Sequence, residues 1–183
     1  MNSMAGHLLI AAPDMVDAYF SNTVVLVFQH SDEGAAGLVL NKPSDVQVNS
    51  VWDELDAKNA HAEKLINIGG PCEGPLIAIH NSLAFAEFPL IPGVAMTVGI
   101  DNLRKLIRQT HQTVRLFSGY AGWSPEQLDA EIDQGGWFSI PARPNYIFGD
   151  AGDLWRKACA KFGDEIVNSI VDQTLIPEDP HLN

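Results

Sequence analysis

Short runs of consecutive apolar residues, each bounded by turn-forming residues, follow one another through the first half of the chain. The clearest run is Val-Val-Leu-Val-Phe at positions 24–28, where no polar residue interrupts the apolar ones. A strand with one face in water alternates polar and apolar residues, whereas an unbroken apolar run is typical of a strand covered on both faces. The chain is therefore expected to place these strands between other layers of structure.

The apolar runs predict strands along most of the chain. The segment 30–35 separates two of these runs and contains Asp32 and Gly34, which is typical of a hairpin loop. The predicted strands are Leu8–Ala12, Thr23–Gln29, Ala36–Leu40, Leu76–His80, Val94–Val98, Val114–Ser118 and Trp137–Ile140.

Three helices are predicted between and after these strands. The first begins at Ser50 and reaches about Lys58, and Asp101 caps the second, whose apolar residues recur at helical spacing. The third begins near Asp150 or Asp153 and ends before Gly163. Because the order of elements is neither a βαβ repeat nor all-β, the 183 residues are expected to form one α+β or mixed α/β domain.

The net charge of −12 is unevenly distributed. The middle sixty residues hold five basic and four acidic side chains, and the predicted second helix carries the one basic cluster, at Arg104, Lys105 and Arg108, with His111 and Arg115 after it. This cluster is either the solvated face of an amphipathic helix or a docking patch for an acidic partner. The acidic total argues against direct DNA binding over a broad surface.

The sequence offers few signals of cofactors or export. Cys72 and Cys159 are far apart and form no CxxC motif, and no histidine pair has the spacing of a zinc site, so no disulfide framework, metal or cofactor is expected. Two isolated thiols are typical of the reducing cytoplasm. The N-terminus lacks the features of a signal peptide, and no apolar run approaches the ~20 residues that span a membrane.

A glycine-rich segment follows the predicted strand that ends at Ser118. Residues 119–123 read Gly-Tyr-Ala-Gly-Trp and predict a turn, after which Ser124 and Gln127 match a helix capping box. The turn is either structural or a ligand pocket beside a helix N-terminus. In the second case the candidate ligand-binding residues are Gly119, Tyr120, Gly122 and Trp123.

Two histidines stand at the predicted carboxyl ends of strands, where sites are common in open sheets. His30 and His80 would share a crevice with Asn41 if their strands were neighbours, and one imidazole would then act as a general base. Each is otherwise a hydrogen-bonded structural residue. No nucleophile elbow or activated cysteine accompanies them, and no catalytic residue is assigned.

Several motifs, in order, resemble the AlgH/YqgE family of bacterial proteins. The resemblance covers about residues 4–163 and leaves a divergent tail at 164–183. It is carried by Gly-His-Leu-Leu-Ile-Ala-Ala-Pro at 6–13, His30, Glu-Gly-Ala-Ala-Gly-Leu-Val-Leu-Asn-Lys-Pro at 33–43, Gly-Gly-Pro at 69–71, His80, and Gly-Tyr-Ala-Gly-Trp at 119–123 followed by Gln127 and Leu128.

The resemblance implies an α+β fold with a bifurcated sheet, part of it closed into a small barrel and flanked by helices. Family members are cytoplasmic, no enzymatic activity is established for them, and their name reflects a proposed role in regulating transcription of alginate biosynthesis. We therefore expect a non-catalytic regulatory or binding protein that acts through protein partners. The alternative is a small-ligand-binding protein or hydrolase-like enzyme with a cleft near His30, His80 and the 119–123 turn.

Overall fold

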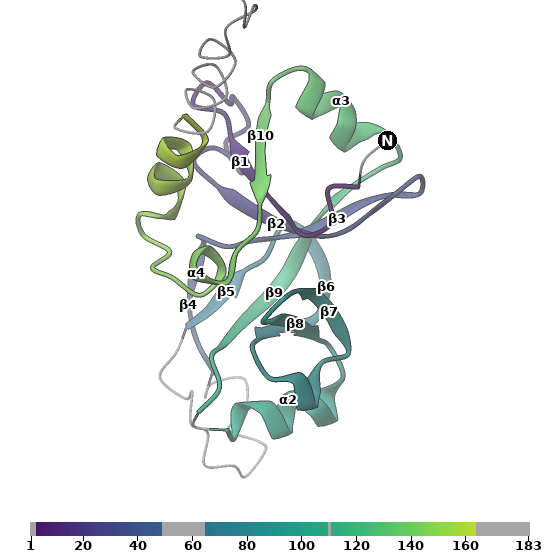
Figure 1. Ribbon diagram of the computed structural model, residues 1–183, viewed down its shortest axis with the longest axis vertical. Coiled ribbons are helices and arrows are strands. Elements are labelled where there is room, and N and C mark those ends of the chain that lie inside the picture. The colour runs from purple at the N-terminus through teal and green to yellow at the C-terminus, as the bar shows by residue number, and fades with distance from the viewer. Residues whose placement is uncertain (1–2, 49–64, 110, 164–183) are drawn as a thin grey trace, which may run out of the picture.

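The computed structural model describes residues 3–48, 65–109 and 111–163, and strands dominate this part of the chain (Figure 1). The first five strands are β1 His7–Ala11, β2 Val24–Ser31, β3 Gly34–Val39, β4 Pro43–Gln47 and β5 Leu65–Ile68. The other five are β6 Cys72–His80, β7 Phe88–Ile91, β8 Val94–Thr97, β9 Val114–Trp123 and β10 Trp137–Pro141. The helices are η2 Leu83–Phe85, α2 Ile100–Ile107, α3 Gln127–Asp133 and α4 Pro144–Ile147, and residues 154–163 are also helical.

The ten strands of the described residues join one curled sheet, and eight of them follow one another in the order β10-β1-β2-β3-β9-β6-β8-β7. The pairings are antiparallel except that of β5 with β9, and the sheet forks at β9, where β5 and then β4 branch off the main path. The long strand β9 therefore connects the β1–β3 part to the β6–β8 part, with α3 beside the former and α2 beside the latter (Figure 1). The fold is α+β, as the sequence and the resemblance predict.

Strands β1 and β2 are buried on both faces, which confirms the interpretation of the unbroken apolar runs. Successive residues of β2 enter different cores: Val24 and Leu26 belong to one hydrophobic cluster, and Val25 and Val27 to another on the opposite face. The helical residues 154–163 contribute to the first cluster through Leu154 and other apolar side chains, and α3 contributes to the second through Leu128.

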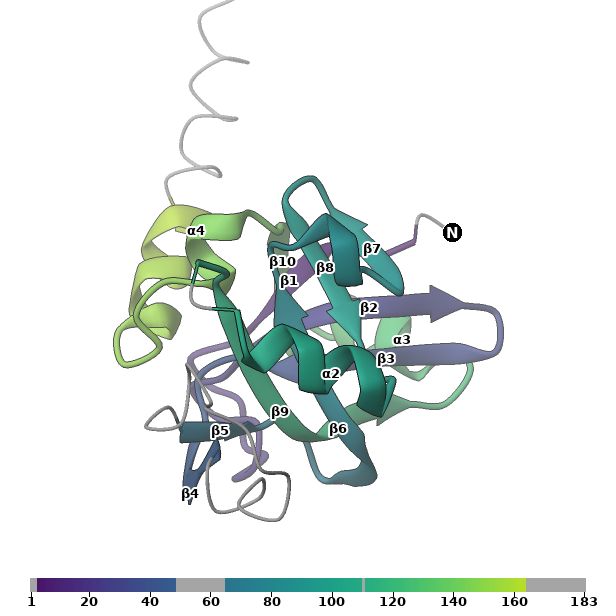
Figure 2. The ribbon, with the colours of Figure 1, turned by 90° about the horizontal axis from the view of Figure 1, so that it is seen from below.

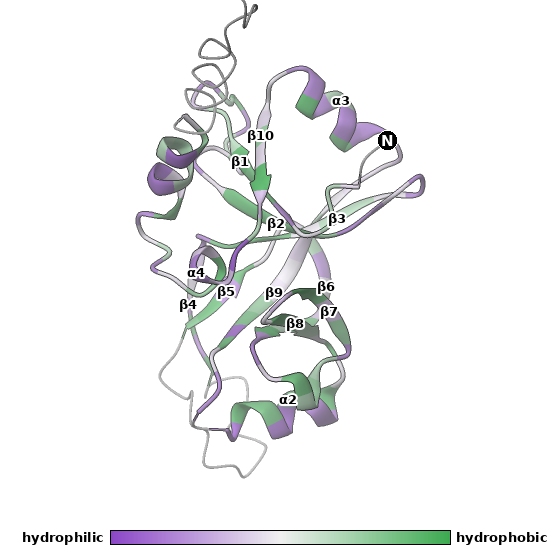
Figure 3. Ribbon diagram, viewed as in Figure 1, coloured by the Kyte–Doolittle hydropathy of each residue, from purple (hydrophilic) through white to green (hydrophobic). Residues whose placement is uncertain are grey.

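A third hydrophobic cluster lies beneath α2. Leu103, Leu106 and Ile107 of this helix are buried against β6 and β9, over which α2 lies in Figure 2, and hydrophilic residues alternate with the apolar ones along the helix (Figure 3). The predicted cap at Asp101 is wrong, because α2 begins at Ile100. The Glu87 carboxylate instead accepts hydrogen bonds from the backbone N–H groups of Val98 and Gly99, at 2.8 and 2.9 Å. These bonds lower the pKa of Glu87.

The Gly-Gly-Pro segment crosses β9. Phe117 of β9 pairs with Asn67 of β5 and also with Ile77 of β6, so β5 and β6 must lie on opposite edges of this strand. Only residues 69–71 connect them, and they pass over β9 where it carries Gly119, whose φ is +72°. A Cβ atom on Gly70 would stand 1.9 Å from the carbonyl carbon of Tyr120. The crossing therefore requires glycine at this contact.

The predicted turn at 119–123 is wrong. Strand β9 continues through Trp123, because Tyr120 pairs with Cys72 of β6 and residues 121–123 pair with Ala35–Gly37 of β3. The hairpin loop between β2 and β3 is shorter than predicted and consists of Asp32 and Glu33.

Other predictions differ at the ends of elements. The helix predicted at Ser50–Lys58 lies outside the described residues. The last helix still includes Gly163, so it does not end before this residue. Gln127 accepts from the N–H of Ser124, which is one half of the predicted capping box, but α3 itself begins only at Gln127. The short strands β4, β5 and β7, which carry no long apolar run, were not predicted.

Candidate functional site

His30 is held by hydrogen bonds on both ring nitrogens. Its Nδ1 accepts from the backbone N–H of Met4 at 3.0 Å, so the proton of the neutral ring is on Nε2. That nitrogen faces the Asp129 carboxylate of α3 at 3.3 Å. The imidazole therefore fastens the N-terminal segment and α3 to the end of β2, and neither nitrogen is free to take a proton from a ligand.

His80 is fully buried at the end of β6. Its Nδ1 accepts from the N–H of Ser82 at 3.2 Å, and its Nε2 donates to Thr97 Oγ1 at 2.9 Å. Thr97 in turn donates to the carbonyl of Phe85. Burial lowers the pKa of His80, so the neutral ring is the stable form in the folded protein.

The two histidines do not share a crevice. His30 pairs with Ala35 of β3, and Ala35 pairs with Trp123, the last residue of β9. His80 pairs with Val114, the first residue of β9. Nine residue steps of extended strand correspond to about 30 Å. The structure therefore does not support a single cleft that contains His30, His80 and segment 119–123.

Asn41 and Gly119 are placed in structural contacts. The Asn41 side chain accepts from the N–H of Val24 at 2.9 Å and donates to the carbonyl of Asn22 at 2.8 Å, so it ties the end of β3 to the start of β2. Gly119 lies at the chain crossing, where a Cβ atom would be 2.7 Å from the Cys72 carbonyl oxygen.

The basic residues named in the sequence have two different environments. Lys105 is exposed on α2 and Arg108 is exposed at its C-cap, and Arg104 pairs with Asp101 at 3.5 Å. Arg115 is instead a partly buried residue of β9, where it donates to the carbonyls of Ile147 and Leu40 and to the Asn67 side chain. Desolvation lowers its pKa to about 10, so it remains charged at neutral pH. Arg115 is thus no part of the basic helix face.

Tyr120, Gly122 and Trp123 meet at an apolar groove of about 880 Å³. The groove lies between the β2–β3 hairpin and the β6–β8 part of the sheet, and its other lining residues include Phe28, Phe88 and Leu90. Neither histidine lines it. Three of the predicted ligand-binding residues therefore come together, and His30, Asn41 and His80 lie elsewhere.

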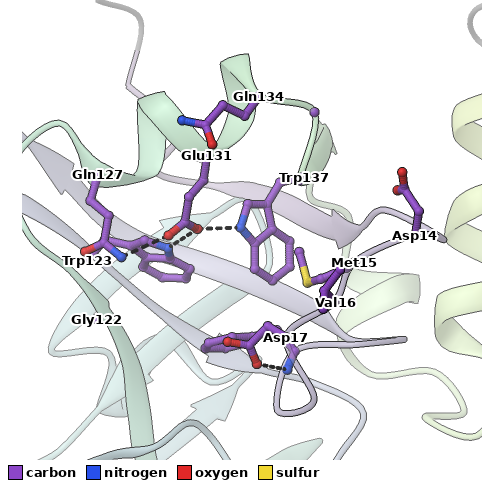
Figure 4. Close-up of a pocket in the computed structure, with 13 residues that line it drawn as sticks. Asp14, Met15, Val16, Asp17, Gly122, Trp123, Gln127, Glu131, Gln134 and Trp137 are labelled. Carbon is purple, nitrogen blue, oxygen red and sulfur yellow. Dashed lines mark hydrogen bonds between the residues drawn. The ribbon is translucent and has the colours of Figure 1, made fainter.

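On the other side of Trp123 is a second recess, which we call the tryptophan pocket (Figure 4). It has a volume of about 390 Å³ and lies between α3 and the segment that follows β1. The pocket is lined by Asp14, Met15, Val16, Asp17, Phe20, Gly122, Trp123, Gln127, Glu131, Gln134, Gly135, Gly136 and Trp137.

Glu131 organises the tryptophan pocket. Its Oε2 accepts from the indole N–H groups of Trp123 and Trp137, at 3.0 and 2.8 Å, and its Oε1 accepts from the Gln127 amide at 2.9 Å (Figure 4). The indole rings cross at 77° with centroids 6.2 Å apart, and Phe20 lies within 6.2 Å of both. One carboxylate therefore fixes two aromatic walls from different strands.

The sequence reasoning identified Trp123 and Gln127 but missed the rest of this pocket. Glu131 and Trp137 are not among the predicted ligand-binding residues, and the sequence places Trp137 only in a strand. The one available signal was the spacing of Gln127 and Glu131, which places both on one face of a helix. Their meeting with Trp137 depends on the pairing of β10 with β1.

The described residues contain no group of three or more His, Cys, Asp or Glu side chains arranged to hold a metal ion. The helices in this part of the chain include none that is long and apolar enough to cross a membrane. The curled sheet, the glycine crossing and the peripheral helices define an α+β protein.

Comparisons with known proteins show the family. The family model described as AlgH-like matches residues 8–167, and the chain belongs to this family. It is 33% identical to a UPF0301 protein of Ruegeria pomeroyi, covering 87% of this chain and 92% of the relative, and 37% identical to one of Methylocella silvestris, covering 86% and 84%. The solution structure of AlgH from Pseudomonas aeruginosa superposes with a TM-score of 0.74 at 29% identity, covering 87% of this chain and 88% of that one.

Proposed function

We propose that this chain is a non-catalytic, cytoplasmic binding protein that acts through protein partners, and that the tryptophan pocket is its recognition site. The histidine geometry supports a binding role, because each imidazole is held on both nitrogens by neighbours within the fold. General-base catalysis needs a nitrogen that can reach the reacting proton. The connected sheet, in which all described strands take part, supports a single domain.

The observation that carries the proposal is the carboxylate that joins the two indoles. Trp123 and Trp137 donate to the same oxygen of Glu131, so hydrogen bonds within the fold hold both pocket walls in place. A preformed pocket loses little side-chain entropy on binding, which favours recognition. Aromatic side chains held in pockets are also the residues that contribute most to protein interfaces.

The test compares partner capture by three forms of the full chain. Glu131→Gln keeps the size of the side chain and removes its charge, and Glu73→Gln makes the same charge change at an exposed position outside the pocket. A partner that works through the pocket is retained by the wild type and by Glu73→Gln and is lost from Glu131→Gln. Equal recovery of every captured protein by all three forms would refute the assignment of the pocket.

The outer face of α2 is a second candidate docking surface. Lys105 and Arg108 are exposed there in a chain with a net charge of −12, and this supports contact with an acidic protein partner rather than with DNA. The double variant Lys105→Glu, Arg108→Glu is expected to lose such a partner, and wild-type binding is expected to weaken with added salt. Binding unchanged by both would exclude the α2 surface.

A further inference from the structure

The tryptophan pocket combines negative charge with aromatic surface. Among the residues that the structure describes, its lining includes three carboxylates, Asp14, Asp17 and Glu131, and no Lys, Arg or His. Lys42 is the cation near Asp17, but its Nζ donates to the Tyr19 carbonyl and lies 3.6 Å from the centre of the Tyr19 ring. The pocket therefore has a negative potential that favours a positively charged ligand.

The aromatic residues favour the same kind of ligand. Phe20 and Trp123 are stacked, with their rings at 26° and their centroids 6.2 Å apart, and Trp137 meets both of them edge-to-face, at 73° and 77°. Ring faces attract cations through their quadrupole, and tryptophan does so most strongly. Met15, which lies beside Trp137, and the exposed Val16 supply contacts for an aliphatic stem (Figure 4).

The hydrogen bonds of Glu131 discriminate between cations. A carboxylate offers about four lone-pair positions, and three are taken by the two indoles and the Gln127 amide. A guanidinium needs two acceptor positions for its paired hydrogen bonds, whereas an ammonium group can use one. The remaining capacity of this carboxylate therefore suits a compact ammonium better than a guanidinium.

We propose that the tryptophan pocket binds a compact alkylammonium group, the side chain of a lysine on the partner protein. This assignment rests on the proposed function, since it names the chemistry by which the partner is recognised. The ammonium contacts Glu131 and the parts of Phe20 and Trp123 that the pocket leaves exposed, and the methylene stem lies along Met15 and Val16. The pocket volume, about 390 Å³, is within the ~300–1,000 Å³ typical of small-ligand sites.

The experiment is a titration of the ¹⁵N-labelled full chain followed through its indole N–H signals. The probes are the N-acetyl methylamides of lysine, arginine and norleucine, together with tetramethylammonium. The Trp123 and Trp137 signals report on the pocket, and Trp155, whose N–H donates to the Ala11 carbonyl at 2.8 Å, is the internal reference. The lysine derivative is expected to shift the two pocket signals and to bind at least about threefold more tightly than the arginine derivative, while norleucine has no effect.

Variants test the role of the carboxylate. Glu131→Gln keeps an oxygen for the indole donors and is expected to weaken binding of the lysine derivative about tenfold, which corresponds to ~1.4 kcal/mol. Glu73→Gln is expected to leave binding unchanged. Equal binding by norleucine and lysine, tighter binding of arginine, or an unaffected Glu131→Gln variant would each overturn the ammonium assignment. Binding of tetramethylammonium without the lysine derivative would also overturn it, in favour of a free small amine.

The two proposals fail in different ways. If a partner is lost from Glu131→Gln in the capture experiment and the lysine derivative gives no shift, the pocket remains the recognition site but its ligand is not lysine. If the lysine derivative binds and capture is identical for all forms, the pocket binds ammonium but is not the site of partner recognition.

Discussion

Replacement of Gly70 by alanine should destabilise the protein strongly, because the chain crosses β9 at this residue. The added Cβ atom would lie 1.9 Å from the carbonyl carbon of Tyr120 and 2.1 Å from its oxygen. Favourable contacts between carbon atoms lie at about 3.5–4.0 Å, so the two backbones would have to separate by roughly 1.5 Å. Both atoms that Cβ meets belong to main chain, which cannot rotate away.

The cost follows from the hydrogen bonds that hold the crossing. Gly69 donates to the Ser118 carbonyl and accepts from the N–H of Val39, both at 2.8 Å. Separation of the backbones breaks these bonds at ~1–3 kcal/mol for each group left unsatisfied, and overpacking adds ~1–3 kcal/mol. The expected loss is about 4 kcal/mol or more, from a total stability that is typically ~5–15 kcal/mol.

Urea unfolding measures this loss directly. With a slope of ~2 kcal/mol per molar, the midpoint of Gly70→Ala should fall by about 2 M. Gly152→Ala is the control, because its Cβ atom would lie 3.5 Å from the Asp150 carboxylate, an ordinary contact. Gly74→Ala should be intermediate, since its Cβ atom meets only the Tyr120 ring, at 3.1 Å. A Gly70→Ala midpoint within about 0.5 M of the wild type would refute the crossing argument.

Three further predictions concern buried or capping polar groups. Because burial lowers the pKa of His80 below 6.5, the unfolded chain binds a proton that the folded chain does not, and stability should fall as the pH drops below about 6.5. In His80→Gln the free energy of unfolding should depend less on pH, and an unchanged slope would exclude His80 as the cause. Glu87→Ala should lower stability by ~1 kcal/mol in chemical unfolding, because it removes the acceptor at the start of α2. Glu87→Gln should remove the part of the acid destabilisation that arises below pH 4.5, where a carboxylate of lowered pKa loses its contribution. Unchanged stability of the first variant and unchanged acid destabilisation of the second would contradict the capping role. Arg115→Met should lower the stability by about 3 kcal/mol in thermal unfolding, because the acceptors on Ile147, Leu40 and Asn67 lose their donor. Arg143→Met, at an exposed position, should leave the stability unchanged. Equal effects of the two variants would show that the environment of Arg115 is immaterial.

Local patterns predicted the parts of the fold that depend on neighbouring residues. The run at 24–28 is apolar at successive positions, and this alone places its strand between two cores, because side chains alternate along a strand. Helix α2 was predicted for a similar reason, since its apolar residues recur at helical spacing and are buried on one face. The short strands β4, β5 and β7 exist through pairing with other strands, and their own residues carry little signal.

The glycine motifs show where local reasoning fails. Gly-Tyr-Ala-Gly-Trp has the composition of a turn, yet it is the end of β9, because β3 and β6 supply pairing partners for it. Gly119 of this motif is required because the Gly-Gly-Pro segment, about fifty positions earlier in the sequence, packs against it in the folded chain. Backbone contact between distant segments leaves no periodic pattern in either one.

The sequence by itself determined the α+β class, the doubly covered strands, the amphipathic face of α2 and the family resemblance, because spacing and local propensity carry these properties. Only the tertiary structure decided which polar side chains meet. It placed His30 two strands away from the end of β9 and His80 beside its start, turned Arg115 away from the basic helix, and brought Glu131 between Trp123 and Trp137. The register of β9 and the pairing of β10 with β1 set these distances, and strand pairing is a long-range property of the folded chain.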